Sequence, residues 1–256
     1  YQPWLRTRHD YVALDVDYTL VSDVTLCKTD QNQNPLSNWR LYLLGDKVGD
    51  TINVPSNGST VDAGNYSADN YVLLASGTYN YRGPGEDADA ANSFRKVGLP
   101  CADSTDGWVN GEASSCMKNY LSLNFSTSGG PSAPGWGTYY NPQHKYAKAF
   151  SGGNLSLKIW DTCNLNQLEG CYGDNEGSLK LDVYKGYVGD TGNNGCITFE
   201  DVPYGEYQLG EILQDGWKEA SGSGTVTIDN PQETFTIVNN ELPKFGNLKV
   251  TKRVDW

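Results

Sequence analysis

The chain has 256 residues and a formal net charge of −12, with a pI near 4.5, and it is long enough for two domains that each bury a core. No stripe of Lys and Arg offsets this charge, which excludes nucleic acid and anionic membrane surfaces as expected partners. No apolar run approaches the length of a membrane span, so direct membrane insertion is not expected either.

The composition is typical of short strands joined by turns. Gly, Asn, Ser, Thr and Tyr are abundant, Met occurs once, and stretches with helical periodicity are scarce, which predicts an all-β fold. The six cysteines form an even set without CxxC spacing, as in a secreted protein rather than at a zinc site. We therefore expect an extracellular or cell-surface protein.

Taken in chain order, the predicted strands fall into outer and central stretches. Residues 24–44 predict a strand, a polar turn and a second strand, and residues 195–240 continue in the same style with four strands and tight turns. Between them lies a block richer in Gly, Ser and Asn. Its strands are predicted at residues 71–81, 120–126, 155–161 and 177–184. Residues 1–22 are expected to be a strand or linker, and they show no signal-peptide pattern. The last residues of the chain are expected to be the beginning of a strand that has been cut short.

The outer stretches carry a family resemblance. ITFEDVPYGEYQLGEILQDGW, at residues 197–217, and VTLCKTD, at residues 24–30, resemble strands of the Cna-B-type domain, a prealbumin-like β-sandwich repeated along bacterial adhesins and pilins. The resemblance covers about a third of the chain, and the long central block interrupts it. It implies a Cna-B-like sandwich with a second β-sandwich inserted in a loop, where extra length costs little closure entropy. The expected units are residues 23–45 with 185–241, the insertion at 46–184, and a linker with the first strand of a following module at 242–256.

The resemblance also implies an internal cross-link. Domains of this type commonly join a Lys on the first strand to an Asn or Asp on the last, assisted by an acidic residue, which maps here onto Lys28, Glu211 and Asn239. Strand alternation places Lys28 with Leu26 on one face, and Asn239 shares a parity with the apolar residues of its own strand. A one-residue change of register would make Asn240 the acceptor instead, and a surface ion pair of Lys28 with Glu211 is the alternative without a bond.

The central block resembles the LecA-type galactose-binding lectins, which implies a jelly-roll or lectin-like sandwich that binds calcium. IWDTCNLNQLEGCYGDNEGSLKLDV, at residues 159–183, looks like that family's calcium loop. The ligands that the resemblance implies are the side chains of Asp161, Asp174 and Asn175 and the main-chain oxygens of Tyr81 and Cys171. Charged and neutral oxygens from loops suit calcium rather than zinc. A plain Asx turn at residues 174–175 is the alternative.

The sugar site that the lectin resemblance implies is altered here. GPGEDADAANSF, at residues 83–94, lacks the family's His and Gln pair, so Asp87 or Asp89 is considered as a ligand and Trp136 as a stacking surface for a sugar ring. Tyr79, Tyr81 and Tyr139 are further aromatic candidates. Aromatic residues at strand ends are more often packing residues, which is the alternative for all four rings. The calcium could equally be structural.

Three disulfides are expected. Proximity in the sequence pairs the cysteines of two loops, and the sandwich resemblance pairs two strands. The expected pairs are Cys101 with Cys116, Cys163 with Cys171, and Cys27 with Cys196.

We expect a structural and adhesive module of a microbial surface protein or filament, with calcium as cofactor. Its expected partners are host-cell or environmental glycans or proteins and neighbouring copies. No catalytic triad can be placed, and the carboxylates show no glycosidase spacing signal, so an enzyme is not expected. The alternatives are a calcium-dependent carbohydrate-binding lectin and an accessory module of a polysaccharide-degrading enzyme.

Overall fold

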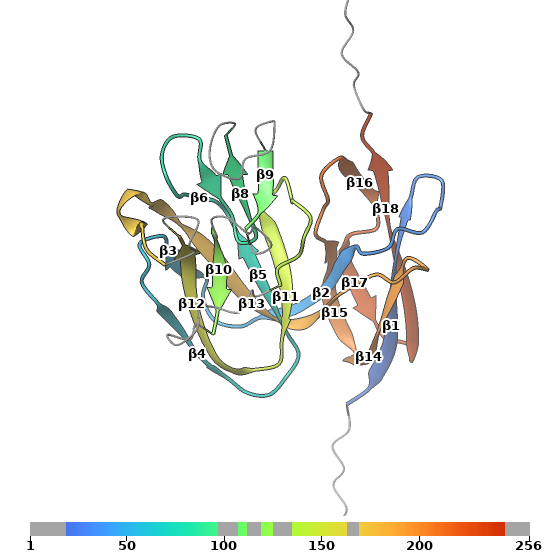
Figure 1. Ribbon diagram of the computed structural model, residues 1–256. Helices are drawn as coiled ribbons and strands as arrows, with labels where there is room; N and C mark the ends of the chain where they lie inside the picture. Colours follow the sequence, from blue (N-terminus) through green and yellow to red (C-terminus); the bar gives the residue numbers. More distant parts are fainter. Residues whose placement is uncertain (1–18, 97–106, 112–118, 125–134, 163–168, 244–256) are drawn as a thin grey trace, which may run out of the picture.

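The computed structural model describes residues 19–96, 107–111, 119–124, 135–162 and 169–243, and these residues form an all-β protein, as the sequence predicted. Two bodies of strands lie side by side (Figure 1). The described residues contain one 3₁₀ turn and no α-helix. Accordingly, none of their helical segments could cross a bilayer.

The first group of strands runs through the outer stretch and into the central block: β1 (Val21–Asp30), β2 (Arg40–Lys47), β3 (Ile52–Pro55), β4 (Val61–Tyr66), β5 (Tyr71–Ser76), β6 (Tyr79–Asn80), β7 (Asp87–Ala88), β8 (Asn92–Arg95), β9 (Gly107–Asn110), β10 (Asn119–Leu123), β11 (Lys145–Phe150) and β12 (Gly153–Asp161). After the 3₁₀ turn η1 (Tyr172–Asp174) follow β13 (Glu176–Asp190), β14 (Cys196–Pro203), β15 (Gly205–Glu211), β16 (Trp217–Ser221), β17 (Gly224–Ile228) and β18 (Gln232–Glu241).

The outer stretches of the sequence build one sandwich. One sheet has the order β14-β1-β18-β16, and the strands β17-β15-β2 belong to the other. The first strand, β1, is antiparallel to β14 and parallel to the last strand, β18. Alternate residues of β1 are buried, as expected for a strand with one face on a core. The core consists of Val24, Leu26, Trp39, Leu41, Leu43, Val202, Leu209, Ile228 and Ile237.

The central block forms the second body around a separate core. Its strands β5, β11 and β6 to β9 extend the large sheet, and a three-stranded sheet has the order β10-β12-β4. Tyr146, Leu155, Leu157, Ile159, Leu179 and Leu181 are among the fully buried residues between them. The lectin-like character of this body stays a prediction.

Strand β13 joins the two bodies. Its first half pairs with β3, β5 and β6 in the central block, and its second half pairs with β2 of the outer sandwich. The predicted domain boundary between residues 184 and 185 therefore falls inside a 15-residue strand. The pairing with β2 shifts register between Tyr184 and Gly186, and this irregularity marks where the strand passes from one core to the other. The domain division stays a prediction.

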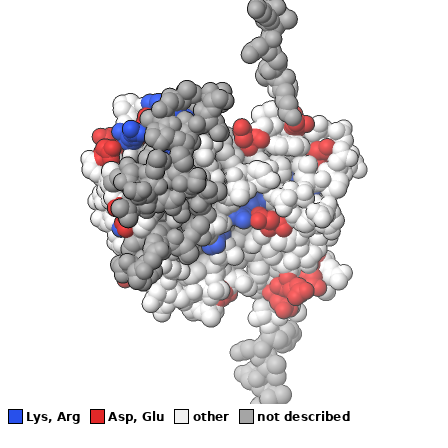
Figure 2. Space-filling view, viewed as in Figure 1, with Lys and Arg blue, Asp and Glu red and all other residues white. Residues whose placement is uncertain are grey.

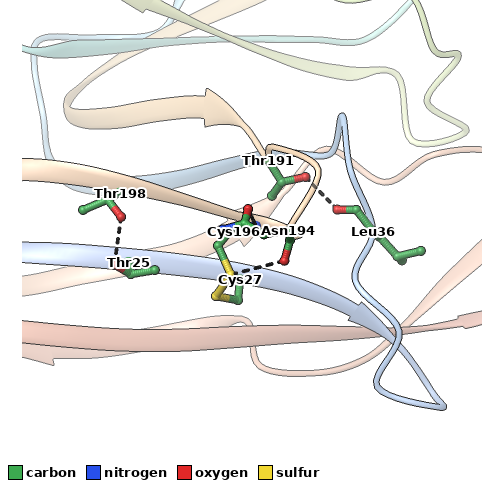
Figure 3. Close-up of a disulfide and its surroundings, with 7 residues drawn as sticks. All are labelled: Thr25, Cys27, Leu36, Thr191, Asn194, Cys196 and Thr198. Carbon is green, nitrogen blue, oxygen red and sulfur yellow. Dashed lines mark hydrogen bonds between the residues drawn. A yellow bond between two sulfur atoms is a disulfide. The ribbon is translucent and has the colours of Figure 1, made fainter.

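A disulfide ties β1 to β14. Cys27 and Cys196 are register partners in the antiparallel pair and are bonded to each other (Figure 3). Next along the same pair, the hydroxyls of Thr25 and Thr198 lie 2.9 Å apart in a hydrogen bond. Cys171 is also disulfide-bonded. Its expected partner Cys163 and the expected pair Cys101 and Cys116 lie outside the described residues.

We predict that Gly186→Ala destabilises the protein. Gly186 has φ 151°, and an added Cβ would lie 2.0 Å from the Leu43 carbonyl oxygen and 3.3 Å from Leu44 Cα. Because these atoms belong to the paired backbone, relief requires moving β2 against β13, at a cost of about 1–3 kcal/mol or more. Urea unfolding measures the loss.

Gly107→Ala is the matched control, because no atom of the described residues lies within 4 Å of its added Cβ. We expect this variant to change the free energy of unfolding by no more than about 0.5 kcal/mol. Equal free energies of unfolding for the two variants would contradict the close approach of the β2 and β13 backbones at Gly186.

Candidate functional site

A lysine lies inside the outer sandwich. Lys28 is on β1, two residues after the core residue Leu26, and it has 0% exposure. Its register partner on the parallel strand β18 is Ile237, two residues before Asn239, which is also 0% exposed. The face that alternation predicted for both side chains is the buried one. Asn240, the rival acceptor, is exposed.

Glu211 reaches these two residues from the facing sheet. It ends β15, which pairs with β2, and its side chain is 3% exposed. Glu211 Oε2 lies 2.8 Å from Lys28 Nζ. The same oxygen accepts a hydrogen bond from Asn239 Nδ2 at 3.2 Å. One carboxylate oxygen therefore contacts both the amine and the amide across the core.

Burial moves both ionisable groups toward their neutral forms. Loss of hydration lowers the pKa of Lys28 to about 8, although the nearby Glu211 carboxylate partly opposes this shift. The pKa of Glu211 is raised by its own burial, against the opposing effect of Lys28 and Asn239. A charge in an apolar site is costly, so the free energy of transferring a proton from Lys28 to Glu211 is reduced.

Two acceptors in this group lack donors. Glu211 Oε1 and Asn239 Oδ1 are buried and have no hydrogen-bond partner among the described residues. Such atoms carry a desolvation cost that a hydrogen bond would remove. A proton on Glu211 would convert one of the two acceptors into a donor.

Trp39 is the neighbour that sequence reasoning missed. Its ring centroid lies 4.9 Å from Lys28 Nζ, and the ring packs edge-on against Trp217 at 5.5 Å. Both tryptophans stand beside turns in the sequence, so no alternation signal assigned them to the core. The indole shields the amine from water and offers its face to the cation.

The predicted calcium residues are partly brought together. Asp161, at the end of β12, is 2% exposed, and its Oδ1 accepts a hydrogen bond from Asn119 Nδ2 at 2.5 Å. Burial raises the pKa of Asp161 to about 7, opposed by Asn175 and Asn119 and reinforced by Asp174. Asp161 Oδ2 and Asn175 Oδ1 are buried without a hydrogen-bond partner among the described residues.

Two of the remaining predicted ligands lie around the 3₁₀ turn, and the third, Tyr81, directly follows β6. Asp174 is exposed at the end of η1, and Cys171 precedes that turn in a left-handed conformation with φ 63°. The Tyr81 side chain is turned toward Phe94 and Arg95. Within the described ranges, no three His, Cys, Asp or Glu side chains form a group that could hold a metal. A calcium site here would depend on amide and main-chain oxygens as well as on Asp161.

Two of the three expected sugar residues are fully buried. Trp136 is 1% exposed and donates its indole N–H to the Leu121 carbonyl at 2.8 Å, so its ring is a core element and cannot stack on a sugar. Asp89 is 0% exposed and accepts hydrogen bonds at both oxygens, including one from the Tyr146 hydroxyl at 2.9 Å. Asp87 is half-buried.

The aromatic candidates divide in the same way. Tyr79 and Tyr81 are buried, whereas Tyr139 is 53% exposed. Of the residues considered for a sugar platform, Tyr139 therefore keeps an accessible ring.

Comparisons with known proteins yield weak likenesses. No protein-family model and no curated protein matches the sequence. A streptococcal ancillary pilin is similar at 14% identity with a TM-score of 0.20, over 88% of this chain and 63% of that chain, so this chain spans less than two thirds of that pilin. The major pilin subunit of Bacillus cereus is similar at 12% identity with a TM-score of 0.19, over 86% and 99%. At these TM-scores the likenesses carry no weight for function, which has to be inferred from the contacts above.

The lowered pKa of Lys28 predicts a pH-dependent stability in a chain carrying Asn239→Ala, which keeps the amine free. The folded pKa of about 8 lies below the ordinary lysine value of 10.5, so the unfolded chain binds more protons between these values and stability rises with pH across this window. Relative to the same chain with Lys28→Met, the gain should be about 3 kcal/mol. Chemical denaturation at a series of pH values measures it. A difference that does not change with pH would show that the amine is hydrated.

Proposed function

We propose that this chain is an extracellular structural and adhesive module of a microbial surface protein, and that an amide bond between Lys28 and Asn239 ties its first strand to its last. The observation that supports this proposal is a buried amine and a buried amide that contact one oxygen of Glu211. An ion pair buried for stability alone is weakly favourable, because desolvation offsets the attraction. A reactive group explains better why the sandwich buries two ionisable side chains, Lys28 and Glu211, in place of apolar ones.

The reaction uses this chain's own residues. Lys28 gives a proton to Glu211 and becomes a neutral nucleophile. Its nitrogen attacks Asn239 Cγ, and the C–N bond to the amide nitrogen breaks, so that a new C–N bond joins the side chains and ammonia leaves. Glu211 carries protons from the attacking nitrogen to the leaving one. In the product Glu211 is neutral and can donate to the new carbonyl, which supplies partners for the two unpaired acceptors.

The packing around the group favours bond formation over hydrolysis. Lys28 and Asn239 are both 0% exposed, and the Trp39 ring lies against the amine. Exclusion of water lowers the competition for the Asn239 carbonyl and holds the reactants in one geometry.

The position of the bond suits a module under tension. The described chain leaves the sandwich at opposite ends, with the start of β1 at the bottom of Figure 1 and the end of β18 at the top. Since β1 and β18 are parallel neighbours, opposite pulls on these ends shear the pair. A bond from Lys28 to Asn239 would pass the force directly between strands, and residues 29–238, including the central block, would bear none.

We also propose that the central body is stabilised by calcium at Asp161. The buried and unpaired oxygens of Asp161 and Asn175 are the hard donors that calcium prefers. Bound there, calcium would supply positive charge that compensates the buried carboxylate and would hold the segment before β13 in place.

The cross-link predicts a mass. The fully reduced, denatured chain should weigh less than its sequence by one ammonia, and Glu211→Gln should restore the full mass because the proton carrier is lost. Intact-mass spectrometry measures both.

The neighbouring asparagine supplies the control for this measurement. Asn240→Ala, at an exposed position on the same strand, should keep the loss of ammonia, whereas Asn239→Ala should remove it. A full mass for the unaltered chain would refute the cross-link.

The calcium site predicts a melting response. Calcium added to chelator-treated protein should raise the melting temperature in a concentration-dependent way, by mass action on the folded state. Asp161→Asn should abolish the response, whereas Asp50→Asn, at an exposed position, should retain it. Identical melting curves in calcium and in chelator would rule the site out.

A further inference from the structure

A cleft lies where the two bodies meet. It has a volume of ≈ 310 Å³ and is walled by residues from both bodies. Arg40 and Asp190, which both line it, form an ion pair, with Arg40 Nε 2.8 Å from Asp190 Oδ1. In Figure 2, basic and acidic side chains meet near the middle of the face, between the bodies. Neither the cross-link nor the calcium residues line this cleft.

One wall carries an exposed aromatic ring. Tyr139 is 53% exposed, and the other exposed large apolar side chains among the described residues, Leu20, Val21 and Leu242, lie beside the two ends of the described chain. Those three are next to positions where the chain continues. Tyr139 is in the middle of the sequence, so its exposure has no such explanation.

The segment that carries Tyr139 is irregular but firmly held. Arg40 Nη1 donates to the Trp136 carbonyl at 2.7 Å, and Asn110 Nδ2 donates to the Gly137 carbonyl at 2.8 Å. The next ring, Tyr140, stacks on Trp108 at 4.9 Å with the planes 13° apart.

The opposite wall also holds this segment. The Asp215 amide donates to the Tyr140 carbonyl at 3.3 Å, so contacts from the outer sandwich and from β9 fix both flanks of Tyr139. A ring presented on a fixed backbone loses little entropy when a ligand stacks on it.

Polar residues of the other body line the cleft as well. Asn38 is exposed, and Gln214 is half-buried and donates Nε2 to the Asn38 carbonyl at 3.0 Å. Asp190 accepts two bonds from Arg40, but its side chain is 47% exposed, and a carboxylate has lone pairs for more than two donors. Ile212 and Leu213 complete an apolar patch on this wall.

We propose that this cleft binds a short saccharide. An accessible Tyr ring suits the apolar C–H face of a sugar, and the amides of Asn38 and Gln214 with the Asp190 carboxylate suit hydroxyl groups, which both donate and accept. A mostly apolar or basic peptide would not provide hydrogen-bond partners for both the donors and the acceptors of these amides. The volume is at the small end of the range for ligand sites and fits the end of a glycan rather than a long polymer.

The proposal deepens the adhesive part of the proposed function and rests on it for its biological role, but the site depends on neither the cross-link nor calcium. The site uses the Tyr139 ring with Asn38, Gln214 and Asp190, whereas the expected sugar site used Asp87, Asp89 and the Trp136 ring; Trp136 also lines this cleft, but its ring is buried. Binding is therefore expected to continue in chelator.

The test uses the full chain and a panel of methyl hexopyranosides, their N-acetylated forms and disaccharides, by calorimetric titration in calcium and in chelator. At least one saccharide should bind equally in both. Tyr139→Ala should weaken that binding roughly tenfold or more through loss of ring stacking. Tyr139→Phe, which keeps the ring, should bind as the unaltered chain does, and Gln214→Ala should weaken binding through a lost hydrogen bond.

Three outcomes overturn the proposal: no binding across the panel, binding that Tyr139→Ala leaves unchanged, and binding abolished by chelator or by Asp161→Asn. Intact mass, measured on the same samples, reports the cross-link separately. Melting curves of the variants confirm that any loss of binding is local.

Discussion

The Lys28 amine has to be accommodated inside an apolar sandwich, where its charge loses hydration and has to be balanced. Glu211 supplies that balance from the facing sheet at 2.8 Å, and Asn239 bonds to the same oxygen. Three strands must therefore hold their registers together: β1, β15 and β18. A buried charge is expensive, so a slip that separated the pair would carry a large penalty, and the group fixes the arrangement of the sandwich that contains it.

The same strands explain how the outer sandwich can carry a large central body. The central block enters after β2 and leaves along β13, whose two halves belong to different cores. The disulfide from Cys27 to Cys196 ties β1 to β14, and the proposed bond would tie β1 to β18. Both links are made by adjacent residues of β1, with Cys27 on one face and Lys28 on the other, so one short strand would anchor the sheet on both sides.

Composition was enough to predict the all-β class. Alternation placed Lys28 and Asn239 on the inward face, because a strand with one buried side has a strict period of two. It could not predict strands as short as β7, which have too few residues for a pattern. Trp136 was considered as a stacking surface for a sugar ring, with packing as the alternative, and its burial supports packing. Its burial depends on a contact with Leu121, distant in the sequence, and such contacts leave no local signal. Likewise, the position of Glu211 on the facing sheet came from resemblance, not from periodicity.

Single-molecule force spectroscopy, with handles at the two chain ends and the disulfides reduced, tests most directly whether the first and last strands are covalently joined. The cross-linked sandwich should bear force without releasing residues 29–238, so no extension corresponding to their length should occur, whereas the Asn239→Ala chain should release them. If the unaltered chain extended by the full length of residues 29–238, no covalent bond would join β1 to β18, and the proposed role of Lys28 would be wrong.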